Sequence, residues 1–323
     1  MSTRRRPARV TALLVTTREG AVLLTQGGPR PGDLPHTRIR TRENPYSAAR
    51  RLAAGLNLSL AETTLLAIDE AEGYNGPQTV HVMSARLSPS SAPPAAGHCL
   101  TPVGQATAAM TPSAASRLKA VCRATILNTM SPTRQEPLRL VDGRNVLQPA
   151  TKAERTRSRF TWHPRLTPPE EIPVQQTWGW LVDPHGRVLV MLDRHGVPSL
   201  PGGRPEAGES PFETLAREAE EEVQARLSTP YPLGYQQVRE HGRPPYAQLR
   251  LGALLRGLDS AAPDRDTGEK YQRVLIPARQ ANLLLGWGPE GDAQAHAVSR
   301  IWPPLTTRPA QYVPETGLEF TEE

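Results

Sequence analysis

The sequence predicts an α/β fold in which a mixed sheet lies between helices, and it predicts two copies of that fold. Three observations support this expectation. Short apolar runs rich in β-branched residues alternate with turn residues. A helical pattern of apolar residues follows a pair of glycines. The whole pattern then occurs twice within 323 residues, a length that suits two domains of ordinary size.

The repeat is visible without a gap when residues 20–58 are placed on residues 186–224, a shift of 166 positions. Ten of these 39 positions are identical, against roughly two or three expected by chance. The identities pair Gly20 with Gly186, Val22 with Val188, Leu23 with Leu189, Leu34 with Leu200, Pro35 with Pro201, Arg38 with Arg204, Glu43 with Glu209, Pro45 with Pro211, Arg51 with Arg217, and Ala53 with Ala219. Shared composition explains the same order of elements less well than duplication does.

The elements of the second copy are expected in the following order. Two apolar runs, residues 177–183 and 187–193, are joined by the turn residues Asp-Pro-His-Gly and predict strands. A helix is expected to begin at Ser210 as N-cap, with Pro211 in the first turn and Glu213 closing a capping box. Further strands are expected at residues 231–238, 246–255 and 273–277, and a helical region at 278–300.

The first copy shows the same order with fewer clear signals. Asn44 and Pro45 predict the start of its helix, residues 79–87 a late strand, and residues 113–130 a final helix. We therefore expect a first domain at residues 1–130, a second at residues 174–305, and a tail at residues 306–323. Residues 131–173, rich in proline and arginine, are interpreted as a linker.

Charge and cysteine content limit the partners that we expect. The net charge is +6, but only three of the 38 basic residues are lysine, a bias more typical of GC-rich coding than of a basic binding surface. The basic run at residues 152–160 is interpreted as solvated linker, with nucleic-acid contact as the less favoured alternative. Two cysteines and no apolar stretch of about 20 residues favour a cytoplasmic protein with no membrane partner.

Four glutamates crowd into five positions of the predicted second-copy helix, at residues 218 and 220–222. Glu218, Glu221 and Glu222 are spaced by three and four residues, so their side chains share one arc of the helix. Like charges at this spacing repel, and hard divalent cations such as Mg²⁺ or Mn²⁺ neutralise them with oxygen ligands. A metal site is therefore predicted, and a solvated acidic face is the alternative.

The stretch from Gly203 to Ala225 resembles the Nudix box, G-x5-E-x7-R-E-U-x-E-E-x-G-U, of nucleotide pyrophosphohydrolases. Six defined positions agree: Gly203, Glu209, Arg217, Glu218, Glu221 and Glu222. Gln224 stands where the box has glycine, and Ala219 and Ala225 are smaller than its usual aliphatic residues. The resemblance implies a Nudix-type α/β/α sandwich that hydrolyses diphosphates.

The resemblance also implies a role for each matching residue. Glu218, Glu221 and Glu222 would bind Mg²⁺ or Mn²⁺, together with the carbonyl oxygen of Gly202. The metal-site positions would be organised by Gly203, Glu209 and Arg217, with Arg217 orienting Glu218 and pairing with Glu209. The general base would be Glu218 or the loop residue Glu240.

The expected activity is Mg²⁺-dependent hydrolysis of a nucleoside diphosphate linked to another group. ADP-ribose and NDP-sugars are favoured only because such substrates are common in the superfamily. The alternatives are a nucleotide sensor without turnover and, third, an isomerase that converts diphosphates without cleavage. The first copy is expected to be inactive, because Leu52, Gly55 and Leu56 replace the carboxylates and His36 and Thr37 replace the glycines.

Overall fold

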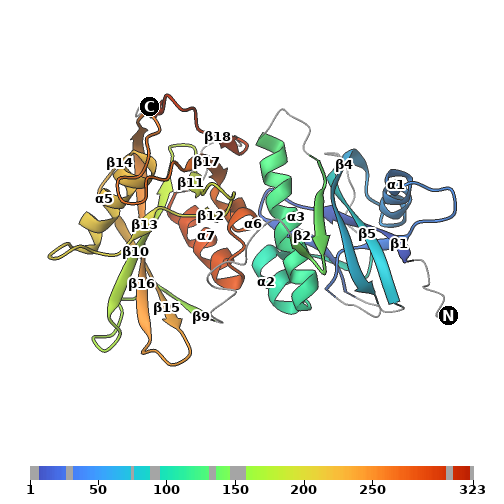
Figure 1. The fold of residues 1–323 in the computed structure, drawn as a ribbon, viewed down its shortest axis with the longest axis horizontal. Helices are drawn as coiled ribbons and strands as arrows, with labels where there is room; N and C mark the ends of the chain where they lie inside the picture. The colour runs from blue at the N-terminus through green and yellow to red at the C-terminus, as the bar shows by residue number, and fades with distance from the viewer. Residues whose placement is uncertain are drawn as a thin grey trace. The chain divides into compact units, whose positions relative to one another are not determined.

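The computed structural model describes residues 7–26, 32–73, 76–87, 95–130, 136–145, 158–302 and 308–320. The chain divides into two compact units (Figure 1). One comprises Met1–Gln148 with Asn282–Pro289, and the other comprises Pro149–Ala281 with Glu290–Glu323. Among the described helices, none has the length and apolar character needed to cross a membrane. Most of the basic run at residues 152–160 lies outside the described residues.

The second unit is built on a mixed sheet with the strand order β18-β17-β11-β10-β16-β15-β9. Its strands are β9 (Arg159–Pro164), β10 (Val174–Val182), β11 (Arg187–Leu192), β15 (Tyr231–Arg239), β16 (Tyr246–Leu258), β17 (Gln272–Pro277) and β18 (Gln311–Tyr312). β10 and β16 run parallel, whereas β15 and β16 form an antiparallel hairpin. Four short strands, β12 (Pro198–Ser199), β13 (Gly202–Gly203), β14 (Ala225–Leu227) and β19 (Leu318–Glu319), pair with β11, β10, β16 and β16. The mixed α/β class is confirmed.

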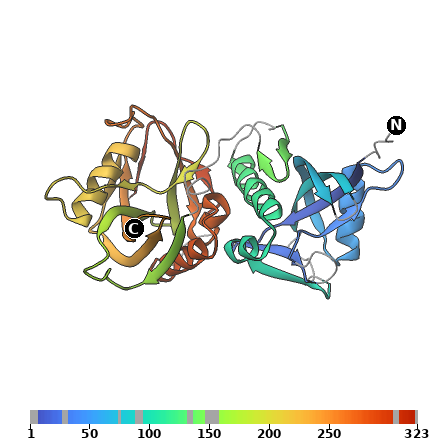
Figure 2. The ribbon, with the colours of Figure 1, turned by 60° about the horizontal axis from the view of Figure 1, so that its bottom comes forward.

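Helices cover both faces of this sheet (Figures 1 and 2). α5 (Pro211–Val223) lies on one face, where Leu215, Ala219 and Val223 enter a buried cluster with Leu181 and Leu251. On the other face lies α7 (Pro289–Ile301), where Gln294 accepts hydrogen bonds from Trp180 of β10 and Arg250 of β16. η1 (Ala278–Gln280) and α6 (Ala281–Leu285) precede α7 in the chain. The apolar stripe of α5 therefore faces the core and leaves its glutamates at the edge of the sandwich.

The ends of α5 are both specified by side chains. At the start, the Ser210 side chain accepts from the Glu213 N–H and the Glu213 carboxylate accepts from the Ser210 N–H, so the predicted capping box is confirmed. At the end, Gln224 takes a left-handed conformation with φ 51°. Its side-chain amide donates to the carbonyl of Ala262, and its side-chain oxygen accepts from the Ala262 N–H. These two bonds hold a helix end that glycine would form with less strain.

The first unit contains a second mixed sheet, in the order β3-β1-β5-β4-β7-β8, and a β2-β6 pair. Its elements are β1 (Ala8–Val15), β2 (Ala21–Thr25), β3 (His36–Arg38), α1 (Pro45–Gly55), β4 (Leu60–Gly73), β5 (Gly76–Leu87), β6 (His98–Pro102), α2 (Val103–Ala109), α3 (Pro112–Met130), β7 (Leu138–Val141) and β8 (Arg144–Asn145). The expected helix at residues 113–130 is thus confirmed as α3. The buried pair of Arg117 and Asp69, 2.5 Å apart, joins α3 to β4.

Strand pairing and register agree between the two units at the shift of 166 residues. β1 runs parallel to β5 and antiparallel to β3, as β10 does to β16 and β13. Thr11 faces Thr37 in the first unit, and the equivalent Thr177 faces Gly203 in the second. Even single backbone bonds recur: Leu13 donates to Pro35, and Gly179 donates to Pro201, each at 2.8 Å.

The structure differs from the sequence expectation at the segments taken as linker and tail. Within residues 131–173, the described part contains β7 and β8, which extend the first sheet, and β9, which forms the edge of the second. Within residues 306–323, β18 pairs with β17, and β19 pairs with β16. Of these strands β8, β9 and β18 lie at sheet edges, where one side of the strand meets solvent.

Candidate active site

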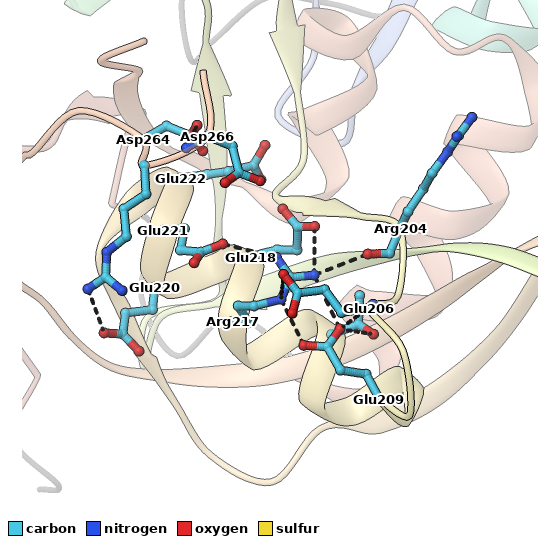
Figure 3. A network of polar contacts seen from close by, with 12 residues as sticks. Arg204, Glu206, Glu209, Arg217, Glu218, Glu220, Glu221, Glu222, Asp264 and Asp266 are labelled. Carbon is cyan, nitrogen blue, oxygen red and sulfur yellow. Dashed lines mark hydrogen bonds and ion pairs between the residues drawn. The ribbon is translucent and has the colours of Figure 1, made fainter. Parts of the chain in front are cut away.

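Figure 3 shows Glu218, Glu221 and Glu222 of α5 with Arg217, and two of these carboxylates lie against the short glycine strand β13. Glu222 is 9% exposed, and its Oε2 accepts a hydrogen bond of 2.8 Å from the backbone N–H of Gly202. Glu218 comes one helical turn earlier and lies against Gly203. The helix and the strand thus bring the predicted residues of both segments together.

Steric contacts require both glycines of β13. A Cβ on Gly202 would come within 2.2 Å of the carbonyl oxygen of Thr177, and the residue has φ +146°. A Cβ on Gly203 would lie 2.1 Å from Oε1 of Glu218. Gly202 therefore allows β13 to pair closely with β10, and Gly203 makes room for a carboxylate.

Arg217 holds the acidic residues in position. Its Nε donates to Glu209 at 2.8 Å, one terminal nitrogen donates to Glu221 at 2.9 Å, and the other donates to Glu218 at 3.2 Å and to the Arg204 carbonyl at 3.1 Å. Arg217 thus makes the contacts expected of it with Glu209 and Glu218. The guanidinium also holds the pKa of Glu209 down, at about 2.

Burial disfavours the charged forms of the two inner carboxylates. Burial raises the pKa of Glu222 to about 8, and the negative charges of Glu218 and Asp264 add to this increase. Burial also raises the pKa of Glu218, although Arg217 opposes the effect. Carboxylates with raised pKa values at one place mark a site where a cation would be stabilising.

Asp264 is an acidic residue of this site that the sequence reasoning missed. It lies in the loop between β16 and β17, is 6% exposed, and acts electrostatically on both Glu218 and Glu222. In Figure 3 it appears beside Glu222. Its Oδ1 accepts hydrogen bonds within its own loop, from the Asp266 N–H and the Thr267 hydroxyl. Sequence spacing carries no signal for it because 42 residues separate it from Glu222.

Glu240, the second candidate for the general base, contacts residues outside α5. It follows β15, accepts a hydrogen bond from Ser158 at 3.4 Å and lies 3.4 Å from Arg243. Among the described residues, no hydrogen bond or ion pair links Glu240 to the carboxylates of α5. The structure thus brings together Gly202, Gly203, Glu209, Arg217, Glu218, Glu221 and Glu222. The described hydrogen bond and ion pair of Glu240 are with Ser158 and Arg243.

The donor chemistry of the site fits a hard divalent cation, because buried carboxylate oxygens are the ligands that Mg²⁺ and Mn²⁺ prefer. Within the described ranges, however, no three His, Cys, Asp or Glu side chains are arranged as a metal-binding group. The contacts give the reason. Glu221 is directed to Arg217, and Glu222 is directed to the Gly202 N–H. Glu221 and Glu222 are thus each held by another partner and do not face one ion together with Glu218.

A cavity of about 650 Å³ adjoins the C-terminal half of α5. Glu221 lies in its wall, with Arg226, Ser228 and Arg265 among the polar residues around it. A volume of this size is within the range of small-molecule sites.

Comparison with known proteins gives a consistent result. Residues 175–293 match the family model of the NUDIX domain. Among solved structures, the chain is similar to the pyrophosphohydrolase BsRppH of Bacillus subtilis, with 20% identity over 32% of this chain and 63% of that chain and a TM-score of 0.28. It is also similar to MutT from a study of Aliivibrio salmonicida and Vibrio cholerae, with 17% identity over 38% of this chain and 94% of that one and a TM-score of 0.29. The similarity thus spans under two thirds of BsRppH. No curated protein sequence matches the chain.

The matched residues 175–293 include the acidic helix α5 and the glycine strand β13 of the second unit. This part of the chain is similar to the NUDIX domain.

Proposed function

We propose that the second unit hydrolyses the diphosphate linkage of a nucleoside diphosphate joined to another group, and that it requires Mg²⁺ or Mn²⁺. ADP-ribose and NDP-sugars are the favoured substrate types. The observation that carries the proposal is Glu222, a buried carboxylate whose pKa of about 8 reflects burial next to the charges of Glu218 and Asp264. A divalent cation would offset this excess of negative charge and would recruit the phosphates of the substrate.

Glu218, Glu221 and Glu222 would hold the cation, and the carbonyl oxygen of Gly202 would add a backbone ligand. A bound cation of this kind supplies water activation and stabilises charge on the phosphoryl oxygens. Arg217 would keep Glu218 and Glu221 in reach of the ion while Glu209 anchors the guanidinium. The cavity beside Glu221 would admit a small-molecule substrate.

Glu218 and Glu240 remain the two candidates for the general base. A raised pKa suits a group that must accept a proton from water near neutral pH, and burial raises the pKa of Glu218. Glu240 would need to approach from the hairpin after β15. The pH profile of kcat separates the two: Glu218→Gln should remove the acidic limb if Glu218 is the base, and Glu240→Gln should remove it if Glu240 is.

The first unit is proposed to be a degenerate copy of the same fold. The equivalence of register supports this, and so does the ion pair of Arg51 with Glu43 at 2.9 Å, which repeats that of Arg217 with Glu209 at 2.8 Å. Leu52, Gly55 and Leu56 stand at the positions of the three carboxylates, and none of them can bind Mg²⁺. We expect no hydrolysis from this unit.

A substrate panel tests the proposed function. The full-length protein is incubated with ADP-ribose, NDP-sugars and other nucleoside diphosphate derivatives, with Mg²⁺ or with excess EDTA, and the products are separated by chromatography. Cleaved products should form only with the metal, and Glu222→Gln should abolish them. Glu220→Gln is the matched control, because its carboxylate lies on the same helix but is 71% exposed. It should retain activity.

The alternative function is a nucleotide sensor without turnover, favoured by the presence of the first unit, which lacks the ligands. Binding of the same compounds without any product, in the presence of Mg²⁺, would support the sensor and contradict the hydrolase. Full activity in EDTA would contradict the metal assignment. Conversion of a substrate to an isomer would indicate the third possibility named from the sequence.

A further inference from the structure

The two units carry opposite charge at equivalent positions of the same local fold. Residues 202–222 of the second unit contain seven glutamates and two arginines, whereas the equivalent residues 36–56 of the first contain five arginines and one glutamate. The backbone around both segments is alike. Arg51 donates to the Arg38 carbonyl at 2.9 Å, and Arg217 donates to the Arg204 carbonyl at 3.1 Å. A segment that would attract cations in one unit is therefore basic in the other.

The arginines of the first unit are available to a partner. Arg38 at the end of β3, Arg40 and Arg42 in the loop before α1, and Arg50 on α1 are all exposed, and we call this set the basic face. The loop and α1 are held together by Glu43, which accepts from the Arg40 N–H and pairs with Arg51. Among the described residues of this segment, Arg51 is the arginine that is paired with a carboxylate, that of Glu43. Arg51 is therefore a fixed part of the framework, and it joins α1 to the segment that carries three of the exposed arginines.

Two further details set this face apart from an ordinary solvated charge run. Arg42 has φ 66°, in the left-handed region, where the equivalent residue of the second unit is Gly208. Arg42 thus stands at a backbone position where glycine would be less strained. Tyr46, on the first turn of α1, is 38% exposed and lies four residues before Arg50, so the two side chains share one side of the helix.

We propose that this basic face binds single-stranded nucleic acid without a metal ion, with the four arginines on phosphates and Tyr46 stacking on a base. Arginine matches phosphate geometry through its planar fork of donors. Exposed aromatic rings within a basic surface are the usual stacking platform for single strands. The second unit supplies a contrast, because the equivalent aromatic Phe212 is also exposed but lies among carboxylates. This binding site differs from the nucleic-acid contact at residues 152–160 that the sequence suggested, because it lies on α1 and the segment before it.

Fluorescence anisotropy tests the proposal with the full-length protein and a labelled single-stranded DNA of about 12 nucleotides. EDTA is present throughout, so hydrolysis in the second unit plays no part. Four phosphate contacts predict that log Kobs falls with log[KCl] with a slope of about −3, since single strands give about −0.7 per contact. Duplex DNA of the same sequence should bind more weakly, because its bases are not open to stacking.

Variants separate the two contributions. Arg40→Gln combined with Arg50→Gln should reduce the slope to about −1.4 by removing two contacts. Tyr46→Ala should weaken binding about tenfold with no change of slope, because stacking is not a charge effect. The matched control is Arg139→Gln, at an exposed arginine on β7 in the same unit, and Glu222→Gln controls for the second unit. Both should leave affinity and slope unchanged.

Four results would overturn the proposal. The first three are no binding at about 50 mM KCl, an equal loss of affinity in Arg139→Gln and in the double variant, and equal affinity for duplex and single strand together with a neutral Tyr46→Ala. The fourth is a loss of affinity in Glu222→Gln, which would place the binding on the second unit. Because every measurement is made without metal and without turnover, failure here is independent of the hydrolase assignment.

Discussion

Replacing Glu222 with glutamine should make the metal-free protein more stable at alkaline pH, although it removes a proposed metal ligand. Glu222 is 9% exposed, and its pKa in the folded protein is about 8 against 4.5 for an ordinary glutamate. Between these two values the folded state holds the proton and the unfolded state has lost it. The stability of the metal-free protein must therefore fall as the pH rises through this window, and it levels off above pH 8.

The size of the effect follows from the same two values. At about 1.4 kcal/mol per pH unit, raising the pKa from 4.5 to about 8 corresponds to at most about 5 kcal/mol at pH 8.5. Glutamine does not titrate, and its side-chain oxygen can still accept the hydrogen bond from the Gly202 N–H. The variant should therefore lose most of this pH dependence and keep the fold of β13 against α5.

Thermal unfolding in EDTA at pH 5.5, 7 and 8.5 measures the effect. Wild type should show a falling Tm across this series, and Glu222→Gln a nearly constant one. Added Mg²⁺ should restore the Tm of wild type at pH 8.5 by mass action and leave the variant unchanged. Glu220→Gln, at a 71% exposed carboxylate, is the control and should follow wild type. Parallel pH dependences of wild type and Glu222→Gln would refute the reasoning.

Further changes near the site should separate structure from chemistry. Arg217→Ala removes the hydrogen bonds to Glu209 at 2.8 Å and to Glu221 at 2.9 Å, and it should lower both Tm and kcat. Calorimetry should show a smaller loss of Mg²⁺ affinity than for Glu222→Gln, and equal losses would contradict the orienting role. Gly202→Ala places a Cβ 2.2 Å from the backbone of β10 and should destabilise by about 2–4 kcal/mol in urea unfolding. Gly203→Ala meets only the flexible end of Glu218 and should lower kcat with a smaller loss of stability, so similar Tm losses in the two alanine variants would count against this division. Gln224→Gly relieves about 1 kcal/mol of strain in the left-handed backbone but loses two hydrogen bonds to Ala262, in the loop between β16 and β17. A small net destabilisation is therefore expected, and a gain in Tm would show that these bonds contribute little.

Local sequence signals predicted the parts of the fold that depend on neighbours in the chain. The capping box at Ser210 and the extent of α3 are of this kind, because caps and apolar periodicity act within a few residues. β9 could not be predicted in the same way. Apolar and polar side chains alternate only weakly along Arg159–Pro164. This segment forms a strand because it pairs with β15, which lies about 75 residues later in the chain.

The site shows the same division between local and distant information. The spacing of Glu218, Glu221 and Glu222 on one helix is a local property of the sequence. In the structure Glu222 and Glu218 lie against Gly202 and Gly203 of β13. Asp264 reaches the same place only through the return of the chain along β16, which no spacing rule describes. Gly202 was expected as a carbonyl ligand and Gly203 as an organising residue, and the structure adds a steric reason for both, because a Cβ would meet Thr177 at Gly202 and Glu218 at Gly203.

The four contacts of Arg217 have a consequence for how any metal would bind. The Arg217 guanidinium already neutralises the carboxylates of Glu218 and Glu221. An incoming divalent ion would therefore replace the guanidinium at these oxygens instead of binding to unpaired carboxylates. The measured affinity would then be the difference between two cations competing for the same oxygens. Because Glu209 keeps hold of Arg217 when the other carboxylates leave, the displaced arginine stays within reach and can return when the ion departs. Such an exchange would make metal release fast even where the ligands are buried.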